Sequence, residues 1–551
     1  MQELRLTPAA LVVWGATICC LLIGLLPAGF FVVATALVFF CARQKGQAIL
    51  VAGLGAASLI GTSLRIRIAT SFALSHEVGR SAEFPATVLG QPKPLSSGGF
   101  LTNVSLDGYP AKIPVFAPEL DDSVVSGASV AVSGQVREST FPGIGTVTVN
   151  GEVDTVAAPR GFAAFAHHVR ATFGQSVQAN VGDAAGGLIP GMVLGDTQYQ
   201  TEAEQQAYID TGLSHLSAVS GANVAIVTTF AIVVASLVGL GLRGRLIAAA
   251  IALSLFAALI GPDPSVLRAS VTGLVGVVAV VASARVEPIH ALCLSVIVLI
   301  FIDPDLAVHF GFALSVAATA GIVALNPLLY RALAVTGWPD IVVRALAVAI
   351  AADLATIPII ALMTGQVSLV SVAANVLVAP VVPLITVLGL IAVVLALLPG
   401  GLEVVLLRAM EPFAWWVHKV ATWGSEMPFA LIDATPAAAL VAYGWIVAGL
   451  VAGRPRLTLA TIVSLILVMQ APFAGHGRTL DPRQLTAHVV ESKEDVEPIP
   501  AGTQVVVVLE SGRPHSRPVQ TASGIPVLFP NRDGPVRLYA DGTQELRGSG
   551  P

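Results

Sequence analysis

Long apolar runs separated by short polar turns dominate the chain. Three of these runs open the sequence, at about 8–26, 28–42 and 47–64, and others follow from 213 to 472. Each run is close to the roughly 20 residues that a helix needs to cross a bilayer. The pattern therefore predicts a polytopic α-helical membrane protein with about 11–13 membrane segments.

The later runs predict further spans and one exception. We expect spans near 213–240, 245–260, 266–283, 288–302, 307–326, 343–363, 437–453 and 457–472. The run at 367–398 is too long for one simple span, and Pro380 and Pro383 interrupt it, so a broken or re-entrant helix is expected there. The segment at 403–424 combines charged residues with tryptophans, which is typical of a helix lying at the membrane interface.

Polar segments divide the chain into further regions. Residues 80–158 alternate in hydrophobicity and contain turn signals such as Asp107-Gly108, which predicts a small β-barrel with an OB-fold as one candidate. Residues 159–200 are expected to hold an amphipathic helix, at the membrane interface or packed on the barrel. The runs at 1–66 are expected to form amino-terminal transmembrane helices, and those at 201–475 are expected to form a helical transmembrane core. Residues 478–551 are expected to form a short β-rich region.

Arg43 and Lys45 separate the second apolar run from the third. Because cytoplasmic loops carry an excess of Lys and Arg, this turn is predicted to lie inside. The prediction is a multi-pass protein of the cytoplasmic membrane with its amino terminus in the cytoplasm and its β-barrel on the exoplasmic side.

Composition narrows the possible functions. Of 551 residues, 55% are hydrophobic and 11% charged, which excludes a soluble enzyme and a disulfide-stabilised scaffold. The formal charge of −5 gives no general attraction to nucleic acid. Residues 81–160 contain eight acidic and four basic residues, so the predicted barrel lacks the overall positive charge that is usual in single-strand binders.

The segment Thr211 to Ile226 has the most unusual local sequence. It places His215, Ser217, Ser220 and Asn223 at the start of an apolar run. One interpretation is a stripe of small and polar residues that packs helices together. A second is the lining of a pathway through the membrane. A third is a membrane-embedded hydrolase that uses Ser220 and His215, although five residues of regular helix would point these two side chains apart.

Several motifs together resemble the ComEC competence family. The run His215-Leu-Ser-Ala-Val-Ser-Gly221 resembles the family signature, with Asn223 where many members have a second histidine. Four further segments resemble family landmarks in the same order along the chain: Gly187–Asp196, Ser265–Ala269, Gly311–Ser315, and Ser371–Asn375 with Pro380. The order of helices, β-domain and helical core is also similar, and the resemblance covers about 1–475.

The resemblance implies an inner-membrane channel that takes up single-stranded DNA during natural transformation. It implies that Ser217, Ser220 and Asn223 present polar groups to phosphates and that Arg268 supplies a charge. We see no nucleotide-binding loop, so the expected partners beside the lipid membrane are an exoplasmic DNA receptor and a cytoplasmic helicase-like ATPase. Many members end in a metallo-β-lactamase-like domain, whose clustered His and Asp ligands this tail lacks, so we predict no enzyme activity, metal or cofactor.

Three polar residues in apolar runs leave alternatives open. Arg268 either pairs with Asp263 at a helix end or contacts phosphate in the channel. Asp353 and Asn375 either make structural hydrogen bonds between helices or line the substrate path. Asp353 together with the broken helix also suits an ion-coupled transporter of small solutes. A family relic that no longer moves DNA is a further possibility.

Overall fold

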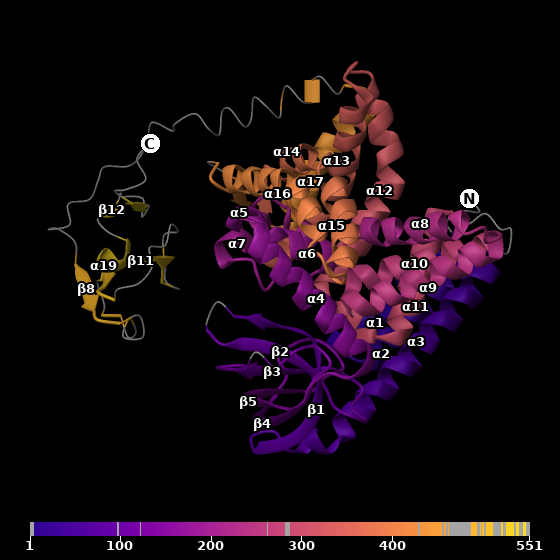
Figure 1. The fold of residues 1–551 in the computed structure, drawn as a ribbon. Helices are drawn as coiled ribbons and strands as arrows, with labels where there is room; N and C mark the ends of the chain where they lie inside the picture. The colour runs from indigo at the N-terminus through magenta and orange to yellow at the C-terminus, as the bar shows by residue number, and fades with distance from the viewer. Residues whose placement is uncertain are drawn as a thin grey trace. The chain divides into compact units, whose positions relative to one another are not determined.

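A computed structural model describes residues 5–454 with gaps at 96–97, 122, 262, 282–286 and 428–429, and parts of 457–461 and 486–546. The chain divides into two compact units, Met1–Ile462 and Val463–Pro551, which are described separately (Figure 1). Most of the span predicted at 457–472 lies outside the described residues.

The first unit opens with three helices, α1 (Thr7–Leu22), α2 (Leu25–Cys41) and α3 (Lys45–Ser71). The first turn lies at Ile23 and Gly24, where Gly24 has a φ of 123°. A helix tolerates proline in its first turn, since that nitrogen needs no intrahelical acceptor, and Pro27 therefore lies inside α2. Helix α3 runs beyond the predicted end at residue 64, and its Ala69 reaches the buried core of the following β-domain.

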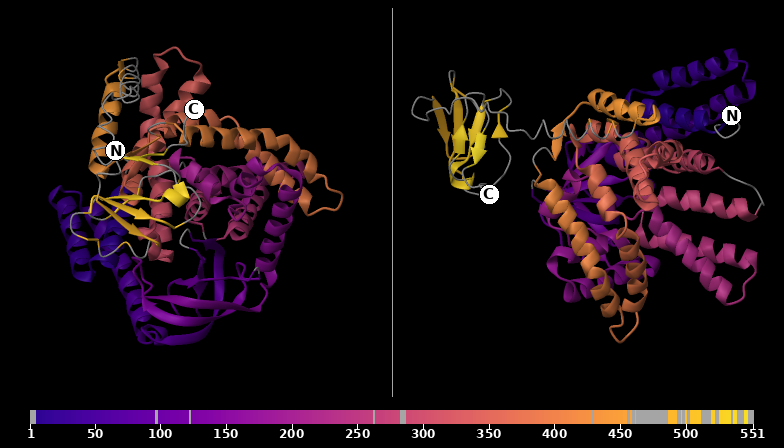
Figure 2. Two further views of the ribbon diagram at one scale, coloured as in Figure 1. Left: turned by 90° about the vertical axis from the view of Figure 1, so that its left-hand side faces the viewer. Right: turned by 90° about the horizontal axis from the view of Figure 1, so that it is seen from above.

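Five strands form the β-domain: β1 (Ser81–Pro94), β2 (Phe100–Ser105), β3 (Ile113–Ala117), β4 (Ser129–Glu138) and β5 (Val147–Ala157). They close into a barrel in the order β1-β2-β3-β5-β4, with β3 and β5 parallel and β1 paired again with β4. This is the strand order of an OB-fold, so the predicted small barrel is confirmed. Alternate residues such as Val104, Val115 and Val132 fill its interior. Figures 1 and 2 show these strands together at one end of the first unit, beside the helices.

Polar contacts join the barrel and α3 to the connection between α11 (Pro288–Ile302) and α12 (Phe310–Ala334). Arg65 of α3 donates to the Ile302 carbonyl at 2.7 Å, and Lys112 lies 3.6 Å from the Asp303 carboxylate. The Ile144 amide donates to Asp305 Oδ1 at 2.7 Å. Because burial outweighs this hydrogen bond, the pKa of Asp305 is raised to about 6.

Helix α4 (Gly161–Asn180) is the predicted amphipathic helix. Its inner face packs Phe173 and Val177 into a core with α6 (Leu188–Leu194) and α16 (Glu403–Ser425), while Phe162 and Phe165 remain exposed. At its middle, Arg170 donates to carbonyl groups at the end of α9 (Leu242–Ile260). The helix therefore packs on the helical core along most of its length.

Three helix pairs form the middle of the first unit: α8 (Gly221–Leu237) with α9, α10 (Pro264–Val281) with α11, and α12 with α13 (Asp340–Thr364). A glycine permits the closest approach between α12 and α13. A Cβ added at Gly321 would lie 2.5 Å from the Ala351 carbonyl oxygen, so any larger residue there would force the two helices apart.

The run at 367–398 is broken, as predicted. Helices α14 (Ser371–Val378) and α15 (Val382–Ala396) meet at an angle of 53° around Pro380. Helix α16 then packs along α15, and strands β6 (Gln366–Ser368) and β7 (Leu431–Asp433) pair before α17 (Pro436–Val451).

Four helices in the described part of the chain, α3, α9, α12 and α13, are long and apolar enough to cross a membrane, or five spans if the bent pair is counted as one. Seven shorter apolar helices of 10–17 residues accompany them. The first unit therefore fits a multi-pass membrane protein. The count of about 11–13 segments and the orientation of the termini stay predictions.

The second unit contains short strands. A four-stranded sheet has the order β10-β11-β9-β8, formed by Val519–Gln520, Pro526–Leu528, Val505–Val508 and Ala487–Val490. β12 (Val536–Leu538) and β13 (Gln544–Leu546) form a separate antiparallel pair. The small core of the second unit buries Val506, Val508 and Phe529.

Candidate functional site

The candidate site surrounds a non-helical segment, residues 211–220, which we term the signature loop. The loop turns at Gly212, which has a φ of 68°, forms a 3-10 turn over Ser214–Ser217 and is extended at Ala218 and Ser220. Helix α8 begins only at Gly221, so the prediction of a helix from residue 213 is wrong. The left-handed turn at Gly212 interrupts a helical path that hydrophobicity alone cannot distinguish from a span.

Ser220 and Asn223 fix the end of the signature loop. Ser220 Oγ accepts a hydrogen bond from the Ala222 amide at 3.2 Å and donates to Asn223 Oδ1 at 3.0 Å. Asn223 is 2% exposed, and its Nδ2 donates to the Met192 carbonyl of α6 at 2.7 Å. One side-chain amide therefore joins the first turn of α8 to the Gly-rich segment that precedes the loop.

Arg268 of α10 lies beside the start of α8. It is 8% exposed, and its Nε donates to Ser315 Oγ of α12 at 2.9 Å. A Cβ added at Gly221 would lie 3.8 Å from Arg268 Nη2, which places the guanidinium against the amino end of α8. An ion pair with Asp263, one of the two alternatives for Arg268, is absent among the described residues, and Asp263 Oδ1 accepts from the Ser265 amide at 2.8 Å.

Two further polar side chains contact or approach the signature loop. Ser265 Oγ lies 2.6 Å from the Val219 carbonyl and so ties the start of α10 to the loop. Gln200 is 7% exposed, and neither of its amide atoms has a hydrogen-bond partner. A Cβ at Gly191 would lie 3.0 Å from Gln200 Nε2 and 3.6 Å from Ser217 Cα, so this glycine lets α6 approach both.

His215 takes no part in a catalytic pair. Its Nδ1 lies 3.2 Å from the Gly212 carbonyl, within the same loop. Ser220 uses its hydroxyl to cap α8 and to bond Asn223, and the described hydrogen bonds include none between Ser220 and His215. The arrangement therefore gives no support to a hydrolase built on these two residues.

A second polar cluster lies at the other end of the signature loop. Asp353 of α13 is 9% exposed, its Oδ1 accepts from Ser371 Oγ at 2.6 Å, and its Oδ2 has no hydrogen-bond partner. The Tyr443 side chain of α17 lies near this carboxylate. Asn375 Nδ2 donates to the Ser371 carbonyl at 2.9 Å within α14. A Cβ at Gly212 would lie 2.7 Å from Ser371 Cβ, so the loop packs directly on the cluster.

The structure thus places six of the seven predicted residues in two groups. Ser217, Ser220, Asn223 and Arg268 gather around the start of α8, whereas Asp353 and Asn375 belong to the cluster on the broken helix. The hydrogen bond of His215 stays within the signature loop. Sequence reasoning did not assign roles to Ser265, Ser315 or Gln200. The two serines lie inside motifs that were recognised, but no pattern marks Gln200, because its burial depends on how α6 packs.

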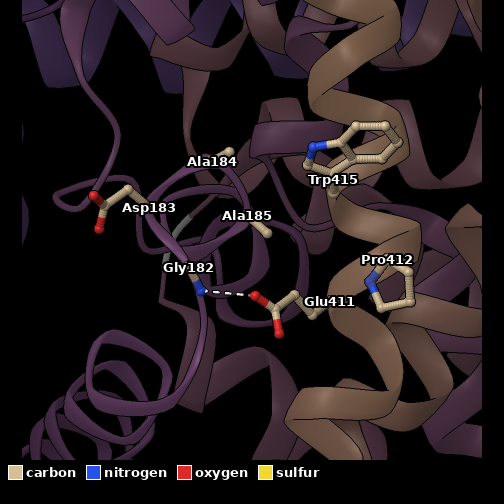
Figure 3. A pocket seen from close by; sticks show the side chains of 7 residues that line it. All are labelled: Gly182, Asp183, Ala184, Ala185, Glu411, Pro412 and Trp415. Carbon is tan, nitrogen blue, oxygen red and sulfur yellow. Dashed lines mark hydrogen bonds between the residues drawn. The ribbon is translucent and has the colours of Figure 1, made fainter.

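A hollow of about 470 Å³ lies between α5 (Asp183–Gly186) and α16. It is lined by Gly182, Asp183, Ala184, Ala185, Glu411, Pro412 and Trp415 (Figure 3). Glu411 Oε1 accepts from the Gly182 amide at 2.9 Å, and this hydrogen bond lowers the pKa of Glu411. None of the predicted site residues lines this hollow.

No group of three or more His, Cys, Asp or Glu side chains placed to hold a metal ion occurs in the part of the chain that the structure describes. The absence of a metal and of a cofactor remains a prediction from sequence.

Comparison with known proteins shows which family and which relative this chain is similar to. Residues 192–456 match the family described as Competence protein. The chain is 28% identical over 268 residues to ComE operon protein 3 of Bacillus subtilis (strain 168). This match covers 46% of the chain but only 32% of that relative. No solved structure matches. The signature loop, Arg268 and Asp353 all lie within the residues that match the Competence protein family.

Proposed function

We propose that this protein is an inner-membrane channel through which single-stranded DNA is taken up during natural transformation. The proposal rests on the family match and on one observation. The buried guanidinium of Arg268 lies at the amino end of α8, and no carboxylate lies within ion-pair distance of it among the described residues. A buried cation without an anionic partner is costly, so a transient anion such as a phosphate would suit this position.

The surrounding groups add to this attraction. The amino end of a helix carries a partial positive charge, and α8 is 17 residues long. Ser315 holds the guanidinium through Nε, which leaves its terminal nitrogens directed toward the start of α8. Local charge of this kind can attract a polyanion although the chain as a whole carries a formal charge of −5.

The test is transformation of a naturally competent host in which this gene replaces the host's own channel gene. Arg268→Gln should lower transformation at least tenfold at equal protein level, because a charged hydrogen bond to phosphate is worth about 1.5–3 kcal/mol. Arg344→Gln is the matched control, since Arg344 is exposed and already pairs with Asp340 at 2.5 Å. Equal transformation by both variants would refute the role of Arg268.

The remaining parts of the proposal come from the family resemblance. An exoplasmic DNA receptor would deliver the strand, and a cytoplasmic helicase-like ATPase would pull it, because the sequence contains no nucleotide-binding loop. The barrel would lie on the exoplasmic side, and this chain would perform no chemical step. Radiolabelled donor DNA that enters cells lacking the gene would contradict the channel function and leave the family-relic alternative.

A second candidate is an ion-coupled transporter of small solutes. The observation in its favour is Asp353, a buried carboxylate whose Oδ1 is held by Ser371 on the broken helix. Buried acids beside broken helices often bind a coupling ion or proton. Reconstituted vesicles would then show solute flux that depends on pH and is lost in Asp353→Asn, whereas the DNA channel predicts no such flux.

A further inference from the structure

Helix α16 buries one face and exposes the other. Met410 and Val417 of its inner face are fully buried in the core that the helix shares with α4 and α6. The opposite face carries Val405, Trp415 and Trp423, each at least 46% exposed. Large apolar and aromatic side chains on the outer face of one helix are typical of a helix that lies between lipid and water. In a chain that fits a multi-pass membrane protein, this outer face is therefore expected to contact lipid.

A cation is held on this outer face between two aromatic rings. Lys419 Nζ lies 5.9 Å from the centre of the Trp415 ring and 6.0 Å from that of Trp423. Cation–π contacts of this kind keep the ammonium beside both rings. The ion pairs found among the described residues include none with Lys419. The ammonium is therefore available to an anionic group, and phosphate is the anion that a lipid headgroup presents.

The hollow between α5 and α16 adjoins this cation and combines apolar walls with two acids. Five of its seven lining residues are glycine, alanine, proline or tryptophan, and the other two are Asp183 and Glu411. Figure 3 shows Asp183 on the α5 side of the hollow and Trp415 on the α16 side. Its volume of about 470 Å³ falls within the ~300–1,000 Å³ that is usual for sites that bind small molecules.

The two acids of the hollow have different surroundings. Glu411 Oε1 accepts from the Gly182 amide at 2.9 Å, and its Oε2 lies 3.2 Å from Arg408 Nη1. Glu411 therefore holds α16 against the start of α5. Asp183 is exposed, and the hydrogen bonds and ion pairs of the described residues include none to its carboxylate. Asp183 is thus the acid that can accept a hydrogen bond from a bound cation.

Opposite charges follow one another along the same side of α16. Glu411, Trp415 and Lys419 are four residues apart, so each lies about one turn, ~5.4 Å, from the next. The Trp415 ring therefore separates an acidic hollow from a fixed cation. A zwitterionic headgroup, in which a short linker joins an ammonium to a phosphate, is complementary to this order of charges. A purely anionic headgroup would meet the two carboxylates of the hollow.

We propose that the hollow and the Lys419 ammonium together bind one phospholipid with a primary amine in its headgroup, phosphatidylethanolamine. The lipid ammonium donates to Asp183 and lies against the Trp415 ring, and the phosphate contacts Lys419. The acyl chains cover the exposed apolar face of α16, which a water-soluble amine would leave in contact with water. This site does not depend on the channel function proposed above.

The experiment is native mass spectrometry of the full-length protein in detergent, titrated with phosphatidylethanolamine, phosphatidylcholine and phosphatidylglycerol of the same acyl chains. Phosphatidylethanolamine should bind most tightly, because choline has no N–H to donate and the glycerol headgroup carries no cation. Asp183→Asn should weaken its binding about threefold, as expected for the loss of one exposed ion pair. Asp107→Asn is the matched control, since Asp107 is likewise exposed but lies between β2 and β3.

Substitutions at Trp415 test the aromatic part of the site. Trp415→Leu should weaken binding of phosphatidylethanolamine about threefold through loss of the cation–π contact, whereas Trp415→Phe should keep most of the affinity. Trp445→Leu is the control, because Trp445 of α17 is 47% exposed and lies outside the hollow. Each variant should unfold at the native SDS concentration, since the replaced side chains are exposed, and this measurement separates lost binding from misfolding.

Three results would overturn the proposal. The first is equal binding of the three lipids, or native binding of phosphatidylethanolamine in both Asp183→Asn and Trp415→Leu. The second is tighter binding of phosphatidylglycerol, which would mean that the cations alone attract the lipid. The third is displacement of the bound lipid by an equal concentration of glycerophosphoethanolamine, which has the same headgroup without acyl chains and would identify a site for a soluble amine. We expect the lipid to stay bound in this competition.

Discussion

Asn223→Ala is the sharpest test of how the signature loop is held. The substitution removes two hydrogen bonds, one from Ser220 Oγ at 3.0 Å and one to the Met192 carbonyl at 2.7 Å. Each such bond contributes about 1 kcal/mol in soluble proteins and about 0.6 kcal/mol on average between membrane helices. The free energy of unfolding should therefore fall by about 1–2 kcal/mol.

The assay is unfolding by SDS in mixed micelles, followed by tryptophan fluorescence. Asn180→Ala is the matched control, because Asn180 Nδ2 bonds only to the Ser176 carbonyl of its own helix at 2.9 Å. That variant should lose no more than about 0.5 kcal/mol, as expected for one local bond. A double-mutant cycle of Ser220→Ala and Asn223→Ala should give a coupling energy of about 0.5–1.5 kcal/mol.

A second measurement shows where in the structure the Asn223→Ala substitution acts. Hydrogen exchange at the Ala222 amide, which donates to Ser220 Oγ, should accelerate in Asn223→Ala because the first turn of α8 loses its connection to α6. The reasoning is refuted if Asn223→Ala unfolds at the same SDS concentration as the native chain and this amide exchanges at the native rate.

Three other predictions concern the fold around the site. Burial raises the pKa of Asp305 to about 6, so the folded state is more stable when this carboxyl group is protonated. Stability should rise by about 1 kcal/mol from pH 7 to pH 5, be lost as pH increases through 6, and show no such change in Asp305→Asn, as measured by thermal unfolding across pH. Gly212→Ala should lower the unfolding free energy by at least about 2 kcal/mol, because Gly212 has a φ of 68° and its new Cβ would lie 2.7 Å from Ser371 Cβ; a near-native SDS midpoint would contradict this. Thr201→Ala should cost about 1 kcal/mol by removing the capping box of α7 (Glu202–Asp210), in which Thr201 and Glu204 bond each other's backbone amides. Thr201→Ser is the variant that keeps the capping box, and equal melting temperatures of the two would be the contrary result.

The parts of the fold that follow from local pattern could be predicted from the sequence. Alternating hydrophobicity and turn residues located the barrel, and two prolines located the break between α14 and α15. The start of α8 could not be predicted in the same way. Leu213, Leu216 and Val219 carry the apolar pattern of the span into the loop before it, and the backbone conformation of Gly212 and the cap at Ser220 mark where the helix begins.

The site was predicted as a set of residues but not as an arrangement. The motifs identified Arg268, Asn223 and Asp353, yet the partners of Arg268 and Asp353 come from helices far away in the chain. Proximity along the chain suggested Asp263 as one possible ion-pair partner of Arg268. In the structure α10 packs on α12, and Arg268 donates a hydrogen bond to Ser315 instead. Such pairings depend on helix rotation and register, which hydrophobicity does not determine.

The contact between Ile144 and Asp305 has a mechanical consequence. The amide belongs to the loop between β4 and β5, and the carboxylate lies just before α12, whose sixth residue is Ser315. Five residues of helix span about 7.5 Å, so the contact at Asp305 and the hydrogen-bond partner of Arg268 lie on one connected stretch of chain, the short turn Pro304–Val308 and the first turns of α12. Loss of the contact at Asp305 is therefore expected to shift the guanidinium of Arg268 as well as the barrel.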